Sequence, residues 1–223
     1  DSILHNLTTT VKHTAPYIEK HAIIRKGSHT EGIIVYGVTE KALNEIFKLD
    51  QFSQSHSSFH HENGIIIGTR LADYLNINTN ENVIIVNPEK INTHHIFEAK
   101  LFEVVSTFQT DFPEYDRLLA FIPFKTAQKY FDIESKMSGL IVNVDNPYEI
   151  EETDTILSDA LGVMPYMTTT WKERHASLLD WLNIYDIPIK LIMIFIAAVG
   201  IFNIGASLWM IIIEKTRDIG ILQ

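Results

Sequence analysis

The chain has 223 residues, a formal net charge of −10 and no cysteine. An acidic surface argues against nucleic acid and anionic lipid headgroups as partners. The lack of cysteine excludes disulfides, thiolate catalysis and cysteine-ligated zinc. The four charges after Leu191 cancel, so the whole net charge belongs to the part before it. That part is long enough for one or two domains with their own cores.

Strands and short helices alternate along this first part. The apolar pattern first predicts strands at 17–25 and 31–36 around the turn Lys26-Gly27-Ser28, and then a helix opened by Thr39 that buries Ala42, Leu43, Ile46 and Phe47. An exposed polar loop at 50–63 follows, then a strand at 64–68, a helix that buries Leu71, Ala72 and Leu75, and strands at 82–87, 101–108 and 118–123. The last predicted elements of this part are a helix at 125–131, a strand at 139–145, a helix at 147–161 and a strand at 163–168. The 101–108 strand should bury Phe102, Val104, Ser106 and Phe108 on one face. We therefore expect an α+β fold, with βαβ-like pieces near both ends of this part enclosing a β-rich middle.

The segment from Thr170 leads toward the C-terminal apolar run. Thr170 and Glu173 have the spacing of a capping box, in which each residue accepts a hydrogen bond from the backbone N–H of the other. The helix that follows should be interrupted at Pro188. Trp181 and Tyr185 fall where an interfacial aromatic belt is expected. This helix should join the first part rigidly to the apolar run.

The apolar run, 191–213, contains no charged residue and is followed by Glu214-Lys215-Thr216-Arg217-Asp218. At 1.5 Å per residue such a helix covers the roughly 30 Å of a bilayer's hydrocarbon core. The alternative is a buried core helix. The chain also starts without methionine and stops just past this helix, so we expect missing segments at both ends.

Three small or polar residues follow helical spacing within the run. Gly200, Asn203 and Ser207 lie at i, i+3 and i+7, on one helix face. An amide in lipid is costly unless it finds a partner, so this face should meet another helix or a protein cavity. Packing within the same protein and direct contact with a substrate are both open.

No catalytic, cofactor or metal site is predicted. Adjacent histidines make poor chelators without a third ligand, so His60-His61-Glu62 with His56, and the pair His94-His95, are interpreted as solvated loop residues. A phosphate-binding GxxxxGK[ST] motif is also lacking. If ATP drives this protein, another chain binds it.

Several stretches together resemble the lipoprotein-releasing ABC permeases of the LolC/LolE type, within the wider MacB/FtsX-like permease superfamily. The matching stretches are GIIVYGV (32–38), IIIGTRLADYLNINTNENVIIVNP (65–88), LFEVVSTF (101–108), FIPFKTAQKYF (121–131), TWKERHASLLDWL (170–182) and FNIGASLWMIIIEKTRDIGILQ (202–223). The last two stretches are the most specific. They are similar to the family's stalk, to its second transmembrane helix and to the charged segment that follows that helix.

The resemblance implies an order of parts. Residues 1–169 would form a periplasmic MacB-like domain, with a porter-like βαβ part and an inserted β-rich part at about 50–120. Residues 170–187 would be a stalk helix, 188–213 a transmembrane helix and 214–223 the start of a cytoplasmic coupling element. One further transmembrane helix would precede this chain and two would follow it, in the bacterial inner membrane.

It also implies sites and partners. Contact with the ATPase would involve Glu214, Lys215, Thr216, Arg217, Asp218 and Ile219. A hairpin hook that receives a periplasmic lipoprotein carrier would include Glu89, Lys90, Ile91, His94, His95, Ile96 and Phe97, although the segment 89–100 is shorter and less basic than in the best-known carrier-binding subunits. The implied partners are a LolD-like ABC ATPase subunit, a second permease copy or paralogue, a lipoprotein client, a lipoprotein carrier and the membrane.

The function expected from this resemblance is lipoprotein extraction from the inner membrane toward the outer membrane, without an enzymatic activity in this chain. Within the superfamily, a MacB-like efflux permease or an FtsX-like regulator of cell-wall hydrolases would share the mechanics. From other classes, a single-span extracytoplasmic sensor and a membrane-tethered metalloenzyme using His60 and His61 are the alternatives.

Overall fold

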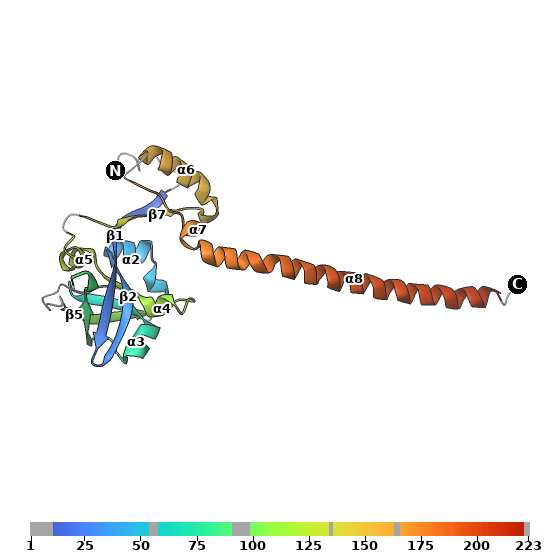
Figure 1. Cartoon of the computed structure of the whole chain (residues 1–223), viewed down its shortest axis with the longest axis horizontal. Helices are drawn as coiled ribbons and strands as arrows, with labels where there is room; N and C mark the ends of the chain where they lie inside the picture. The colour runs from blue at the N-terminus through green and yellow to red at the C-terminus, as the bar shows by residue number, and fades with distance from the viewer. Residues whose placement is uncertain (1–10, 54–57, 91–98, 134–135, 163–165, 221–223) are drawn as a thin grey trace. The chain divides into compact units, whose positions relative to one another are not determined.

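A computed structural model describes residues 11–53, 58–90, 99–133, 136–162 and 166–220. The chain divides into two compact units, 1–148 and 149–223. The α+β expectation is confirmed, because the first unit is built on a mixed sheet with short helices and the second contains helices (Figure 1).

The first two strands form a hairpin, as expected. Strand β1 (Val11–Lys26) pairs antiparallel with β2 (His29–Val38), and the register joins Lys26 to His29 across a two-residue turn. Gly27 in this turn has φ of 58°, a backbone conformation that glycine adopts without steric cost. Both strands extend beyond their predicted bounds.

Six strands close into a ring. The remaining strands of the first unit are β3 (Gly64–Gly68), β4 (Asn82–Val86), β5 (Ala99–Phe108), β6 (Leu119–Pro123) and β7 (Gly139–Val144). The order runs β2-β6-β3-β5-β4-β1, and β1 pairs again with β2. The β2–β6 and β3–β5 pairs are parallel and the others antiparallel. Each strand of this ring therefore has two neighbours, which removes the open edges that invite unwanted pairing.

Strand β1 is long enough to pair with three other strands. Its segment 23–25 pairs with both β2 and β4, whereas its segment 11–17 pairs with β7. Strand β7 therefore joins the ring only through the first half of β1.

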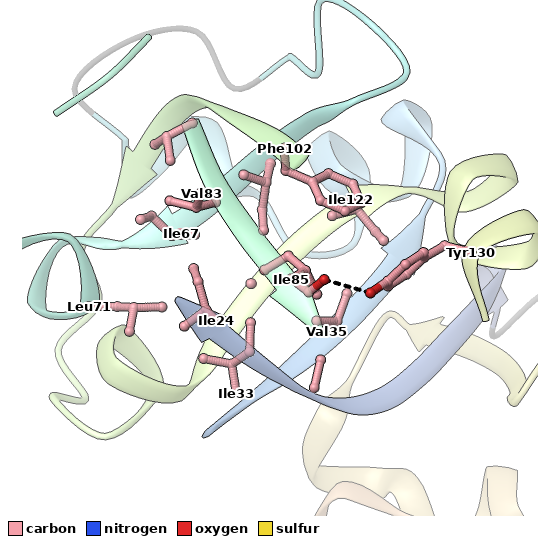
Figure 2. Packing of buried hydrophobic residues seen from close by; sticks show 14 of the residues in the cluster. Ile24, Ile33, Val35, Ile67, Leu71, Val83, Ile85, Phe102, Ile122 and Tyr130 are labelled. Atoms are coloured by element: carbon pink, nitrogen blue, oxygen red, sulfur yellow. Dashed lines mark hydrogen bonds between the residues drawn. The ribbon is translucent and has the colours of Figure 1, made fainter. Parts of the chain in front are cut away.

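Both sides of the sheet are covered. Ile65 and Ile67 belong to one buried cluster, and Ile66 between them belongs to another, as the two-residue period of a strand requires. In the first cluster, Tyr130 donates a hydrogen bond from its hydroxyl to the carbonyl oxygen of Ile85, at 2.6 Å (Figure 2). Burying the polar tip of Tyr130 with a partner avoids the cost of an unpaired hydroxyl.

The short helices cover the sheet. They are α2 (Glu40–Glu45), α3 (Thr69–Leu75), α4 (Tyr115–Leu118) and α5 (Phe124–Tyr130), with 3-10 turns η1 (Leu49–Gln51) and η2 (Pro88–Lys90). Thr39 caps α2 by accepting from the Ala42 amide, at 3.2 Å. The sequence did not predict α4.

The expected exposed loop at 50–63 was wrong in detail. The 50–63 segment is not uniformly exposed, because Phe59 is buried and Ser53 bridges to Phe108 of β5. Phe59 belongs to the buried cluster that contains Ile66, and this apolar contact explains its burial. The polar residues around Phe59 in the sequence gave no sign of it. Residues 54–57, including His56, lie outside the described residues.

The second unit contains α6 (Ile150–Leu161), preceded by the turn η3 (Pro147–Glu149), and then α7 (Trp171–Arg174) and α8 (Ala176–Gly220). The strand expected at 163–168 is wrong for residues 166–168, which have no strand pairing, and its first three residues lie outside the described range.

Candidate functional site

The junction before α8 is fixed by the predicted capping box. The Thr170 hydroxyl accepts from the Glu173 amide at 3.2 Å, and the Glu173 carboxylate accepts from the Thr170 amide at 3.0 Å. Two N–H groups that the first turn of α7 would leave without partners are satisfied reciprocally. Thr170 is buried, so the cap lies in a protected position.

A charged contact ties the same turn to α6. Lys172 donates a hydrogen bond to Glu151, at 2.5 Å. This hydrogen bond and the positive charge of Lys172 hold the pKa of Glu151 below its ordinary value of 4.5. No pattern in the sequence singles out Glu151 as the partner of Lys172. The one available signal was an acidic residue in the first turn of a predicted helix, which is too common to single out a partner.

The helix break lies at a different residue from the one expected. His175 separates α7 from α8, whereas α8 continues through Pro188 without interruption. Proline removes one backbone hydrogen bond and crowds the preceding turn, but the regular bonds on either side maintain the helix. The expected interruption at Pro188 is therefore wrong.

Helix α8 is the long C-terminal helix in Figure 1, and most of its residues are apolar. At 1.5 Å per residue, its 45 residues extend about 67 Å. Within the described residues, the stretch Ala176–Lys215 is the one candidate membrane span by length and composition, and its most apolar window of 18 residues has a mean hydropathy of 2.3. None of its most apolar window is buried, unlike the core helix considered as an alternative.

The aromatic residues at the start of α8 lie together. The rings of Trp181 and Tyr185 are 4.8 Å apart between centroids, in an edge-to-face arrangement. Both are about half exposed. One turn further on, Lys190 pairs with Asp186 at 2.6 Å.

The candidate helix-interface residues lie along the second half of α8. Gly200, Asn203 and Ser207 are all exposed, and a continuous helix places them on one face. Glu214 and Lys215 are exposed near its end, and the helical backbone continues from Thr216 through Arg217, Asp218 and Ile219. The structure thus has the candidate interface residues and the candidate coupling residues on one uninterrupted helix.

The candidate hook is described only at its start. Glu89 lies in η2, where its carboxylate pairs with Lys20 of β1 at 2.7 Å and its amide donates to the Asn87 side chain at 3.0 Å. Lys90 ends the same turn. The other candidate hook residues, Ile91, His94, His95, Ile96 and Phe97, lie outside the described residues.

The histidines that were weighed as ligands have other neighbours. His61 contacts the Glu103 carboxylate at 3.1 Å, and His60 has a left-handed backbone with φ of 54°. In the described ranges, no group of three or more His, Asp or Glu side chains is arranged to hold a metal ion.

Comparison with known proteins extends over almost the whole chain. No family model matches. The chain is 20% identical to the lipoprotein-releasing system transmembrane protein LolE of Haemophilus influenzae, over 96% of this chain and 52% of that protein. It is 24% identical to LolC of Xylella fastidiosa (strain Temecula1), over 94% of this chain and 51% of that protein. The chain thus spans about half the length of the curated relatives it matches.

Among solved structures, a similar chain is the extracellular domain of the noncanonic ABC-type transporter YknZ from Gram-positive bacteria. The TM-score is 0.49 and the identity 16%, over 74% of this chain and 84% of that chain. The chain is therefore similar in sequence to both LolC and LolE, permeases of the LolC/LolE type, over almost its whole length.

Proposed function

We propose that this chain is part of an ABC transporter permease that extracts lipoproteins from the inner membrane and passes them toward the outer membrane. The observation that carries the proposal is α8, an unburied apolar helix that starts beside a capped junction and continues into a charged run. The proposed cargo, a lipoprotein, is taken from the names of the relatives, which are lipoprotein-releasing system proteins.

The proposed arrangement has four parts. Residues 1–169 lie in the periplasm, 170–187 form the stalk, 188–213 cross the inner membrane and 214–223 begin a cytoplasmic coupling element. A bilayer core of about 30 Å accounts for less than half of α8, so the same helix extends into water beyond the membrane. Motion at one end is transmitted to the other because no loop interrupts it.

The work comes from a separate ATPase subunit. The coupling residues Glu214 to Ile219 follow the apolar run directly, where an ATPase on the cytoplasmic side would contact them. Closure of two nucleotide-bound ATPase subunits then moves α8 as a rigid element. The chain itself needs no cofactor for this role.

The energetic problem is the lipid anchor of the client. Each buried CH₂ group contributes about 0.8 kcal/mol to membrane affinity, so three acyl chains do not leave the bilayer without external work. An interface between helices offers apolar surface to those chains while the client leaves the membrane. A soluble carrier then accepts the client at the periplasmic side, through the hook that begins at Glu89.

Reconstitution of the full permease with its ATPase tests the proposal. Proteoliposomes that contain a triacylated lipoprotein should release it to an added carrier only with ATP, and a variant ATPase that binds ATP without hydrolysing it should give no release. Complexes that hydrolyse ATP but never release the lipoprotein would refute the proposed cargo.

A further inference from the structure

An ordered loop of the first unit presents an aromatic side chain to solvent. The loop, 109–116, follows strand β5, and the side chain of Phe112 within it is 56% exposed. The Phe112 N–H donates a hydrogen bond to the Thr110 hydroxyl, at 3.1 Å. The Phe112 carbonyl oxygen accepts from the amides of Tyr115 and Asp116, at 3.0 and 3.3 Å. Both backbone groups of this exposed residue are therefore held in place.

A buried carboxylate orders the same loop. Asp116 is 1% exposed, and its carboxylate accepts from both the amide and the hydroxyl of Thr110, at 2.8 Å each. Burial of a charged group is costly unless hydrogen bonds compensate it, and here those bonds fix a loop whose apolar ring stays in water. An aromatic side chain on a pre-ordered backbone loses little conformational entropy on binding, so residues of this kind anchor protein interfaces.

The surface around this ring is aromatic and acidic. We call it the anchor surface, and it consists of Asp111, Phe112, Glu114 and Tyr115. The rings of Phe112 and Tyr115 are 5.5 Å apart between centroids. The two carboxylates are exposed, and neither forms an ion pair within the residues that the structure describes. Arg117, the nearest cation in the sequence, pairs instead with Glu31, at 2.9 Å. The negative charge beside the exposed ring is thus uncompensated.

Charge decides which occupant fits this surface. The chain carries a net charge of −10, so an acidic surface on it repels a second copy, nucleic acid and anionic lipid headgroups. A lysine or arginine next to an apolar side chain would pair with a carboxylate and cover the ring at the same time. We propose that the anchor surface docks a partner protein that presents a basic patch with an apolar centre.

The anchor surface is separate from the candidate hook. The segment 89–100 leads into the start of β5, whereas the loop that carries Phe112 follows its end. The ten residues of β5 extend about 30 Å along the strand. The docking is also independent of the proposed cargo, because it needs neither an acyl chain nor a membrane.

Photo-crosslinking in growing cells tests this docking. The full-length protein carries the photoreactive residue p-benzoylphenylalanine in place of Phe112, which keeps an aromatic ring at the anchor. The control variant carries it in place of Met137, which is 51% exposed but is flanked by Lys136 and Ser138 instead of carboxylates. The crosslinked products are identified by mass spectrometry. The Phe112 variant is then tested again with the added substitutions Asp111→Lys and Glu114→Lys.

We expect position 112, and not position 137, to crosslink to one protein, through a segment that contains lysine or arginine. The double charge reversal should lower the yield about ten-fold, because like charges then face each other. Exchanging the partner's basic residues for glutamate should restore the yield with the reversed surface. Thr110→Val, which removes the hydroxyl that orders the loop, should lower the yield several-fold with unchanged circular dichroism.

Several results would overturn the docking. They are a product with lipid or with a second copy of the chain, a yield at position 112 no higher than at position 137, a yield that the charge reversal leaves unchanged, and failure of the partner's reversed charges to restore it. Lipoprotein release, measured separately, decides the proposed function.

Discussion

Thr170 and Glu173 hold each other across the first turn of α7, each accepting a hydrogen bond from the backbone N–H of the other, at 3.2 and 3.0 Å. This reciprocal pair fixes where the helical region before the apolar run begins. The start of this helical region is therefore set locally, by side chains that can be replaced one at a time.

Thr170→Ala removes the side-chain acceptor of this cap. Loss of an N-cap costs about 1 kcal/mol, because an N–H group of the first turn then has no partner. Hydrogen exchange at the amides of 171–174 should become several-fold faster. Thr169→Ala is the matched control, since exposed Thr169 lies outside the cap. Equal effects of the two substitutions would show that the cap does not hold this turn.

The Glu151–Lys172 pair predicts a specific pH dependence. Because the pKa of Glu151 in the folded protein is lowered from 4.5, the contribution of the pair to stability is fully present above pH 4.5 and is lost as the pH falls through the lower folded value. Lys172→Met should raise the pKa of Glu151 toward 4.5, whereas Lys172→Arg should keep it low. NMR titration of the Glu151 side-chain carboxyl measures both. An unchanged titration in Lys172→Met would mean that the pair does not form in solution.

Gly68→Ala should destabilise the first unit. A Cβ atom at Gly68 would lie 2.0 Å from the carbonyl oxygen of Asp116 in α4, so the backbone of α4 must move. Such overpacking costs about 1 to 3 kcal/mol. Gly32→Ala is the control, because a Cβ there meets nothing within 4 Å. Calorimetry of the detergent-solubilised chain should show a lower Tm for the first variant alone, and equal Tm values would contradict the close approach of α4 to β3.

Exchanging Arg217 and Asp218 should uncouple ATP hydrolysis from transport. The exchange keeps the composition and the net charge, but it reverses the charge pattern that a partner ATPase would contact. We expect ATP hydrolysis to continue while lipoprotein release stops, with the fold of the first unit intact by circular dichroism. Transport at the original rate would show that these two residues do not form the coupling contact.

The sequence predicted correctly those features that depend on residues close together in the chain. The Lys26–Ser28 turn, the Thr39 cap and the Thr170–Glu173 box each depend on residues a few positions apart, and all three are confirmed. The closure of the ring was not predicted, because β2 pairs with β6 across some eighty intervening residues that no local pattern links. The partner of Lys172 was missed for the same reason, since Glu151 belongs to another helix.

The wrong expectations also have physical causes. Pro188 is a strong local signal for a helix break, but the hydrogen bonds of the turns around it outweigh the loss of one. The apolar Phe59 lies in a segment whose other residues are polar, and its burial depends on a distant cluster. The 166–168 segment has strand-forming residues, but the structure gives it no pairing partner.

The most direct test of the account is the side of the membrane on which each end of α8 lies. Single variants Ser177→Cys and Lys215→Cys, in the full-length protein without other cysteines, can be treated with a membrane-impermeant maleimide in spheroplasts. We predict labelling of Ser177→Cys in intact spheroplasts, and of Lys215→Cys only after the inner membrane is permeabilised. Labelling of both variants in intact spheroplasts, or of neither, would show that α8 does not cross the bilayer and would contradict the account.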